Sequence, residues 1–283
     1  MDITEEQLIN AHKAIGVIDS GVGGLTVVKE ISNRLPHESI IYFGDTARMP
    51  YGPRSYAEVR GFVLEMIDFL QQQEIKILVV ACNSATAAGL SYYQQVCELP
   101  VLGVIEPGVR AALAQSNNGR IGVIGTVGTI NSSEYVKALR SNNGSLHIVT
   151  QACPLFVLLV ENNLVDTPEA KKVAHEYLDP LVRDNIDSLI LGCTHYPLMA
   201  DLIQEVVGPS IKLINSAEEI AAEVETILNN SGMANPLEYE EPRLRFFVSG
   251  SPEPFEEVGS KLLQREIKAY QVHLRNFTLP ANA

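Results

Sequence analysis

The stretch Ile15-Gly-Val-Ile-Asp-Ser-Gly-Val-Gly-Gly24 decides the fold of this chain, because it joins an apolar run to a glycine-rich turn. Residues 14–19 carry several β-branched side chains, which favours a strand, and a helical pattern follows over about residues 25–33. A strand that is apolar at almost every position is typical of a parallel sheet covered by helices on both faces. The stretch therefore predicts the first strand–turn–helix unit of an α/β fold.

The same alternation of strands and helices continues along the chain. Residues 39–43 and 75–81 are apolar runs typical of strands, and Ser55 with Glu58 predicts a capping box at the start of the helix between them. Further strand–helix pairs follow to about residue 207, and a later helix is predicted to start at Ser251, whose hydroxyl group is expected to cap it. This order of elements indicates a mostly parallel sheet architecture.

The two halves of the chain resemble each other. The sequence Ile15-Gly-Val-Ile in the first half returns as Ile121-Gly-Val-Ile in the second, and each half has a later apolar run that ends at a cysteine, Cys82 or Cys193. We therefore predict two pseudo-symmetric, doubly wound α/β domains with mostly parallel sheets and an active site in the cleft between them. The predicted first domain comprises residues 1–98 and 215–283 and carries Cys82, and the second comprises residues 99–214 and carries Cys193.

The formal net charge of −13 argues against partners that need clustered positive charge. Nucleic acids and anionic membrane surfaces are bound through Lys and Arg side chains, so we expect neither as a partner. The composition, with 46% apolar and 19% charged residues, is that of a globular protein. An anionic small molecule would have to be held by local donors, such as backbone N–H groups at a helix start, because the overall field does not attract it.

The sequence also bears on location and on metals. Residues 1–12 lack the apolar segment of a targeting peptide, and the apolar run around residues 77–81 is too short to span a membrane, so we expect a cytoplasmic protein. The four cysteines, at positions 82, 97, 153 and 193, form no Cys-x-x-Cys pair, and no histidine cluster has zinc spacing. We expect no metal, and a single cysteine is more often just a small buried apolar side chain.

Polar residues follow the strands at the ends where an open parallel sheet binds its ligands. Cys82 and Cys193 each come directly after an apolar run and are each followed by polar residues, which argues against a core position. Two pseudo-equivalent domains that face each other would bring the two thiols to opposite sides of one cleft. The polar residues and cysteines at these strand ends are Asp19, Ser20, Cys82, Asn83, Ser84, Thr126, Thr129, Cys193, Thr194 and His195.

Two opposed thiols suit the inversion of a stereocentre. One group removes a proton from one face of a carbon atom and the other delivers a proton to the opposite face, so a reversible enzyme needs the same kind of group on each side. A free thiol has a pKa of about 8.5, and a helix N-terminus or a nearby cation lowers it, so both cysteines are expected to be activated by helix starts. His195 and Asp19 are candidate proton-handling partners.

Three further features have simpler interpretations. The loop Gly21-Val-Gly-Gly24 lacks the third glycine of a dinucleotide site, where Thr26 stands, and Asp19 would repel a pyrophosphate, so a tight turn is favoured. Tyr51-Gly52 lies in a proline-rich loop typical of a turn. Glu161 ends a helical apolar run, a position more typical of a solvated side chain than of a catalytic group.

At these residues the sequence resembles the glutamate racemases of the aspartate/glutamate racemase superfamily. The resemblance is carried by the stretch from Ile15 to Val27 and by three later motifs, Ala81-Cys-Asn-Ser-Ala-Thr-Ala87, Gly103-Val-Ile-Glu-Pro107 and Leu191-Gly-Cys-Thr-His-Tyr-Pro-Leu198. It extends from about residue 14 to the turn at residues 249–253. Ser84 stands where the family usually has Thr, and Leu158 where it often has Pro.

The resemblance implies a cofactor-independent racemase that interconverts L-glutamate and D-glutamate by proton transfer at the α-carbon. Cys82 and Cys193 are the implied acid/base pair, and Asp19, His195 and Glu161 the implied assisting catalytic residues. The product D-glutamate would supply cell-wall peptidoglycan, and a homodimer is implied. The implied substrate-binding residues are Asp19, Ser20, Tyr51, Gly52, Asn83, Ser84, Thr129, Thr194 and His195.

Other functions share some of these features. An aspartate racemase or a related two-cysteine enzyme would carry the same thiols, because the sequence does not fix the depth of the cleft. A two-domain amino-acid binding protein needs no pair of strand-end thiols. A thiol redox protein predicts reversible oxidation of Cys82 with Cys193, and a pyridoxal enzyme would need a Schiff-base lysine.

Overall fold

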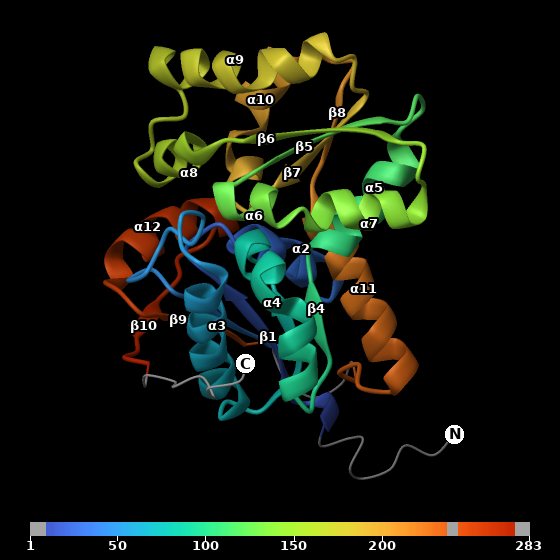
Figure 1. Cartoon of the computed structure of the whole chain (residues 1–283). Helices are drawn as coiled ribbons and strands as arrows, with labels where there is room; N and C mark the ends of the chain where they lie inside the picture. Colours follow the sequence, from blue (N-terminus) through green and yellow to red (C-terminus); the bar gives the residue numbers. More distant parts are fainter. Residues whose placement is uncertain (1–9, 237–242, 275–283) are drawn as a thin grey trace.

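The computed structural model describes residues 10–236 and 243–274 as two parallel sheets, each with helices on both faces (Figure 1). The fold class is α/β with two mostly parallel sheets, as predicted. Residues 1–9, on which the expected absence of a targeting peptide partly rests, lie outside the described residues. Residues 237–242 and 275–283 of the predicted first domain lie outside them as well.

Six strands form the first sheet, in the order β10-β9-β2-β1-β3-β4, with parallel pairing throughout the described residues. These strands are β1 (Ala14–Asp19), β2 (Ile40–Gly44), β3 (Ile75–Val80), β4 (Val101–Gly103), β9 (Leu244–Val248) and β10 (Ala269–Gln271). One face packs against α2 (Leu25–Arg34), α11 (Ser216–Ser231) and α12 (Pro252–Leu263). The other face packs against α3 (Tyr56–Gln71) and α4 (Asn83–Val96).

Four strands form the second sheet, in the order β6-β5-β7-β8. They are β5 (Arg120–Gly125), β6 (His147–Ala152), β7 (Ser188–Gly192) and β8 (Lys212–Ile214). One face packs against α5 (Ile105–Gln115) and α7 (Glu134–Asn142), and the other against α8 (Pro154–Glu161), α9 (Pro168–Arg183) and α10 (Ala200–Val207). The short helix α6 (Val127–Ser132) follows β5, and a 3-10 helix (Tyr196–Met199) lies between β7 and α10.

The two sheets repeat one topology. The order β2-β1-β3-β4 within the first sheet corresponds strand by strand to β6-β5-β7-β8, so the two Ile-Gly-Val-Ile sequences lie on equivalent strands. In each sheet the chain moves to one side of the first strand and then to the other, which makes the gap between β1 and β3, or between β5 and β7, a topological switch point. Cys82 and Cys193 follow β3 and β7, so each thiol lies at such a point.

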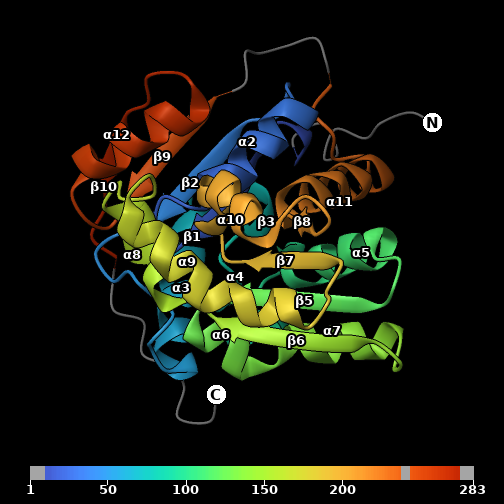
Figure 2. The same cartoon turned by 90° about the horizontal axis from the view of Figure 1, so that it is seen from above.

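The predicted domain boundary at residue 99 needs a correction. β4 pairs with β3, so the chain leaves the first sheet after Gly103. A three-residue strand carries no periodicity that shows which sheet it joins, and this explains the difference. β9 and β10 return to the first sheet, while α11 packs against both α2 and α5 and thus against both halves (Figure 2). The division of the chain into two α/β domains stays a prediction.

Two predicted helix starts have different outcomes. The capping box of Ser55 and Glu58 is present at the start of α3, where each side chain accepts a hydrogen bond from the backbone N–H of the other residue. Ser251 precedes α12, but its side chain makes no capping hydrogen bond, so that prediction is wrong. Pro254 occupies the third helical position and has no N–H to donate to the Ser251 hydroxyl group.

Candidate active site

One pocket lies where the carboxyl ends of the two sheets meet, and both Cys82 and Cys193 line it. The two residues are 5% and 6% exposed. The pocket thus brings together two thiols that are 111 positions apart in the sequence and that follow equivalent strands. The remaining lining residues are Ser20, Pro50, Tyr51, Gly52, Asn83, Ser84, Thr126, Val157, Thr194 and His195.

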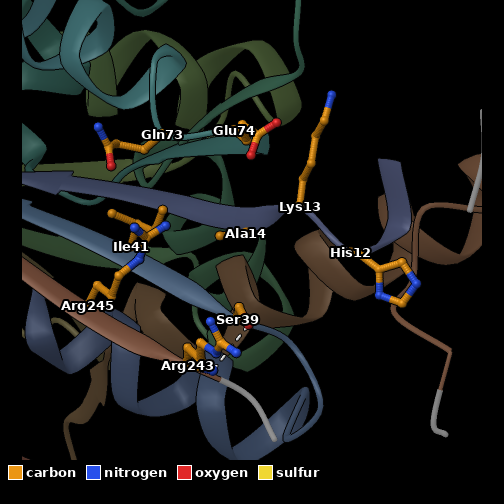
Figure 3. A pocket seen from close by; sticks show the side chains of 9 residues that line it. All are labelled: His12, Lys13, Ala14, Ser39, Ile41, Gln73, Glu74, Arg243 and Arg245. Atoms are coloured by element: carbon orange, nitrogen blue, oxygen red, sulfur yellow. Dashed lines mark hydrogen bonds between the residues drawn. The ribbon is translucent and has the colours of Figure 1, made fainter. Parts of the chain in front are cut away.

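The pocket is closed in this structure. Its volume of about 10 Å³ is close to the minimum for one water molecule. A much larger cavity of about 510 Å³ lies at the opposite edge of the first sheet, where its lining residues include Lys13, Glu74 and Arg245 (Figure 3). That cavity lies at the amino ends of the strands and holds none of the predicted site residues, so its size does not mark it as the active site.

His195 joins Cys193 to Glu161. Nδ1 of His195 lies 3.7 Å from Sγ of Cys193, and Nε2 lies 2.5 Å from Oε1 of Glu161. Burial lowers the pKa of His195, but the contacts with Cys193 and Glu161 outweigh it and raise that pKa well above its usual value. Glu161 is 20% exposed and therefore not the fully solvated helix end that its sequence position favoured.

Asp19 is fully buried behind the pocket and ties the two halves together. Its Oδ2 accepts hydrogen bonds from the N–H groups of Gly21 (3.0 Å) and Gly24 (3.1 Å), and its Oδ1 accepts one from the Thr194 hydroxyl group (3.2 Å). Burial raises the pKa of Asp19, although His195 and these hydrogen bonds act in the opposite direction. The carboxylate thus fixes the glycine-rich turn of the first half against the strand end of the second.

Cys82 differs from the expectation of an activated thiol. It precedes α4, and the N–H of Ala85 and the hydroxyl group of Ser20 lower its pKa, as a helix start should. Burial is the larger effect, and with the charges of Asp19 and Cys193 it raises the pKa of Cys82 above its usual value. The Sγ–H of Cys82 donates to Oγ of Ser20 over 3.7 Å. In the closed pocket, burial therefore favours the thiol form of Cys82 over the thiolate.

A cluster of hydroxyl groups spans the two halves on one side of the pocket. The hydroxyl oxygen of Ser84, in the first half, lies 2.8 Å from the hydroxyl oxygen of Thr126 and 3.4 Å from that of Thr129. Both threonines are in the second half. Thr129 lies behind Thr126 and does not line the pocket itself. The side-chain oxygen of Asn83 accepts a hydrogen bond from the buried Tyr135 hydroxyl group over 2.6 Å. Sequence reasoning missed Tyr135, because a tyrosine within a helix gives no functional signal.

Tyr51 is buried in the pocket wall and is held from behind by Asp45. The Tyr51 hydroxyl group donates to the Asp45 carboxylate, which also accepts from Arg48 (2.7 Å) and from the Ser249 hydroxyl group (2.6 Å). Gly52 accepts a hydrogen bond from the N–H of Gly128 in the second half. Asp45 was missed, although it follows β2 in the same way that Asp19 ends β1, so the strand-end signal could have found it.

A family model described as Asp/Glu/Hydantoin racemase matches residues 15–224. The chain belongs to the Asp/Glu/hydantoin racemase family. Within this family it is 49% identical over 263 residues to the glutamate racemase of Geobacter metallireducens, a match that covers 93% of this chain and 97% of that relative. A crystal structure of a glutamate racemase isoform from Bacillus anthracis shares 48% identity and a TM-score of 0.89, over 93% of this chain and 99% of that one.

Two further solved structures are similar to this chain. A glutamate racemase from Francisella tularensis, solved in complex with D-glutamate, is 37% identical with a TM-score of 0.86 and covers 93% of this chain and 98% of its own. An aspartate racemase from Picrophilus torridus is 21% identical with a TM-score of 0.51, over 78% of this chain and 94% of its own, a likeness that shows the fold alone. In the part of the chain that the structure describes, no helix is long and apolar enough to cross a membrane, and no three His, Cys, Asp or Glu side chains group as metal ligands.

We expect Gly23→Ala to destabilise the protein, because Gly23 lies against the second half of the molecule. An added Cβ atom would lie 2.5 Å from Oγ1 of Thr194 and 2.8 Å from Nδ1 of His195. Overpacking of this kind costs about 1–3 kcal/mol, measurable as a lower free energy of unfolding in urea. Gly61→Ala is the matched control, because an added Cβ atom there meets nothing within 4 Å. Equal stability of the two variants would contradict this account of the interface.

Proposed function

We propose that this protein interconverts L-glutamate and D-glutamate by moving the α-proton between two thiols. The observation that carries the proposal is the pair Cys82 and Cys193, which come from pseudo-equivalent strand ends and line the same pocket. The match to the racemase family and the glutamate racemases at 48–49% identity support glutamate as the substrate.

The two thiols take opposite roles in each direction. The cationic ring of His195 stabilises a thiolate at Cys193, which removes the α-proton from one face of the substrate. Cys82 starts this direction as a thiol, the form that burial favours, and gives its proton to the other face of the carbanion. One S–H bond forms at Cys193 while one breaks at Cys82, so the protein gains no net proton. The reverse reaction starts from the opposite protonation of the pair.

The substrate carboxylates are held by neutral donors in this proposal. No Lys or Arg side chain occurs among the residues found to line the pocket, whereas hydroxyl and amide groups from Ser20, Asn83, Ser84 and Thr194 do. The start of the 14-residue helix α4 adds backbone N–H groups beside Cys82. These short-range donors suit an anionic substrate in a protein of net charge −13. Because the pocket has a volume of about 10 Å³, the two halves must separate to admit an amino acid.

Incubation with L-glutamate or L-aspartate in D₂O tests the substrate. We expect deuterium at the α-carbon of glutamate together with loss of optical rotation, measured by NMR spectroscopy and circular dichroism, without added cofactor. Incorporation into aspartate alone would refute the proposal and favour an aspartate racemase. Binding of glutamate without any α-proton exchange would favour an amino-acid binding protein.

The family resemblance also leads us to propose a cellular role, a location and an oligomeric state. D-Glutamate made here would supply cell-wall peptidoglycan, and the enzyme would act in the cytoplasm as a homodimer without a metal or cofactor. Light scattering on the purified protein measures the oligomeric state, and rescue of a depleted strain by added D-glutamate tests the cell-wall role.

A further inference from the structure

We propose that Asp45 is a positioning residue for substrate binding, which holds the loop that carries Tyr51 and Gly52 in the wall of the substrate pocket. The proposal rests on the proposed racemase function and adds to it a residue outside the predicted site. Hydrogen bonds behind this wall join three segments that are far apart in the sequence, namely the loop of residues 45–54, α3 and the turn after β9. Asp45 lies at the centre of these bonds.

Asp45 lies behind the pocket and not in it. It is fully buried and does not occur among the residues found to line the pocket, whereas Pro50, Tyr51 and Gly52 of the same loop do. The backbone N–H of Asp45 donates to the carbonyl oxygen of Asp19 over 3.0 Å, which fixes the start of the loop beside the end of β1. A change at Asp45 therefore reaches the substrate only through the loop.

Three side chains from different parts of the chain donate to the Asp45 carboxylate. Its Oδ2 accepts hydrogen bonds from the Tyr51 hydroxyl group and from Nε of Arg48 (2.7 Å). Its Oδ1 accepts a hydrogen bond from the Ser249 hydroxyl group over 2.6 Å. Because β2 pairs with β9, Asp45 and Ser249 each follow one of two neighbouring strands. The C-terminal part of the chain thus holds the loop through this carboxylate.

Arg48 extends the contacts of Asp45 to α3. Its Nη1 lies 2.5 Å from Oε2 of Glu65, and its guanidinium group lies over the ring of Phe62, 4.1 Å from the centroid. The ring of Tyr51 packs against the same Phe62 ring, with 5.6 Å between the two centroids. Tyr51 is therefore fixed at its hydroxyl end by Asp45 and along its ring by α3.

The hydroxyl group of Tyr51 has one proton, and it donates this proton in a hydrogen bond to Asp45. Burial and the charge of Asp45 raise the pKa of Tyr51 well above its usual value, so the phenol keeps this proton. While it donates to Asp45, the hydroxyl group does not donate to a substrate carboxylate. Tyr51 therefore serves the pocket through its place in the wall, and Asp45 determines that place.

We expect Asp45→Ala to raise KM for both enantiomers of glutamate on the order of 10-fold and to leave kcat within about 2-fold of the wild type. The loop loses its anchor, so the substrate binds more weakly, but both thiols stay in place. Steady-state kinetics measures both constants. An unchanged KM, or a fall in kcat as large as the rise in KM, would overturn the proposal.

Asp187→Ala is the matched control for Asp45→Ala. Asp187 also accepts several hydrogen bonds, among them those from the Ser116 hydroxyl group and the Asn118 N–H. It precedes β7 and therefore lies at the amino end of the second sheet, away from the pocket. We expect this control to lower the free energy of unfolding in urea and to change neither KM nor kcat. A KM raised equally in both variants would show a general effect of stability and would overturn the proposal.

Asp45→Asn separates the hydrogen bonds of Asp45 from its charge. The side-chain oxygen of an asparagine can accept from Tyr51 and Arg48, and its amide group can donate to the hydroxyl oxygen of Ser249. We therefore expect KM to stay within about 2-fold of the wild type. A KM as high as that of Asp45→Ala would show that the charge acts on the substrate, and it would overturn the positioning role.

A double-mutant cycle with Tyr51→Phe tests whether Asp45 acts through Tyr51. Tyr51→Phe removes the hydrogen bond to Asp45 and should raise KM in the otherwise wild-type protein, but it should have no further effect once Asp45 is replaced by alanine. An equal rise of KM in both backgrounds would show that the hydroxyl group binds the substrate directly, and it would refute the proposal.

Ser249→Ala is the milder variant should Asp45→Ala fail to fold. It removes one of the three donors to Asp45 and should raise KM roughly 3-fold or more while kcat holds. An unchanged KM in this variant would contradict the proposal. Racemisation by the wild type is measured first, because its absence would refute the proposed function and not the positioning role of Asp45.

Discussion

Cys82→Ser and Cys193→Ser are each expected to lower glutamate racemisation on the order of 10³-fold or more in both directions. A serine hydroxyl group does not ionise near neutral pH, so it cannot act as the base on its side of the α-carbon. Since each thiol is base in one direction and acid in the other, neither direction should be spared. Circular dichroism of L- and D-glutamate solutions measures both rates.

Cys97→Ser is the matched control for these variants. Cys97 is buried at the end of α4, carries a free thiol like the other two, and lies outside the pocket. We expect near-wild-type turnover in this control and unchanged far-ultraviolet spectra in all three variants. Near-wild-type turnover in Cys82→Ser or Cys193→Ser would end the two-thiol mechanism.

Asp19→Asn is expected to lower the racemase activity without lowering the stability of the protein. An asparagine has the same shape, its side-chain oxygen can accept from Gly21 and Gly24, and its amide group can donate to the Thr194 hydroxyl oxygen. The variant should therefore fold and be at least as stable as the wild type at neutral pH, because it no longer buries a charge. It also removes the negative charge that acts on Cys82 and His195, so we expect kcat/KM to fall on the order of 10²-fold.

Asp19 should also make the free energy of unfolding depend on pH. The folded-state pKa of Asp19 is raised above its ordinary value, so its contribution to stability is fully present below the unfolded-state pKa and is lost as the pH rises through the folded-state pKa. Asp19→Asn lacks this dependence. The free energy of unfolding of the variant relative to the wild type should therefore increase as the pH rises through that pKa and then level off. Urea unfolding at several pH values measures it, with the exposed Asp201→Asn as control. A constant difference would contradict the raised pKa.

The proposed pair of thiols could be predicted from sequence because its position follows from topology. Cys82 and Cys193 end matching apolar runs in two similar halves, and the carboxyl ends of parallel strands at a switch point are where ligands bind. The polar residues beside them, such as Ser20, Asn83 and Thr194, were placed by the same rule and line the pocket. The periodicity and the ends of strands appear as local sequence patterns, so a single sequence is sufficient to predict them.

The remaining features depend on contacts between distant segments. Nothing near Glu161 in the sequence indicates that the end of α8 would meet His195. The role of Asp45 behind Tyr51 requires Ser249 to come back from the C-terminal part of the chain. The raised pKa of Cys82 depends on how completely the two halves exclude water, which a helix start alone does not reveal. These features depend on burial and on contacts between residues that are far apart in the sequence. A local sequence pattern predicts neither.

A crystal structure of the protein with D-glutamate tests the central claim most directly. The account predicts a pocket that has widened from its closed form, with the α-carbon between the two sulfur atoms and each Sγ within roughly 3–4 Å of it on opposite faces. An α-carbon in contact with only one sulfur, or a ligand bound elsewhere while Cys82 and Cys193 stay packed together, would contradict it.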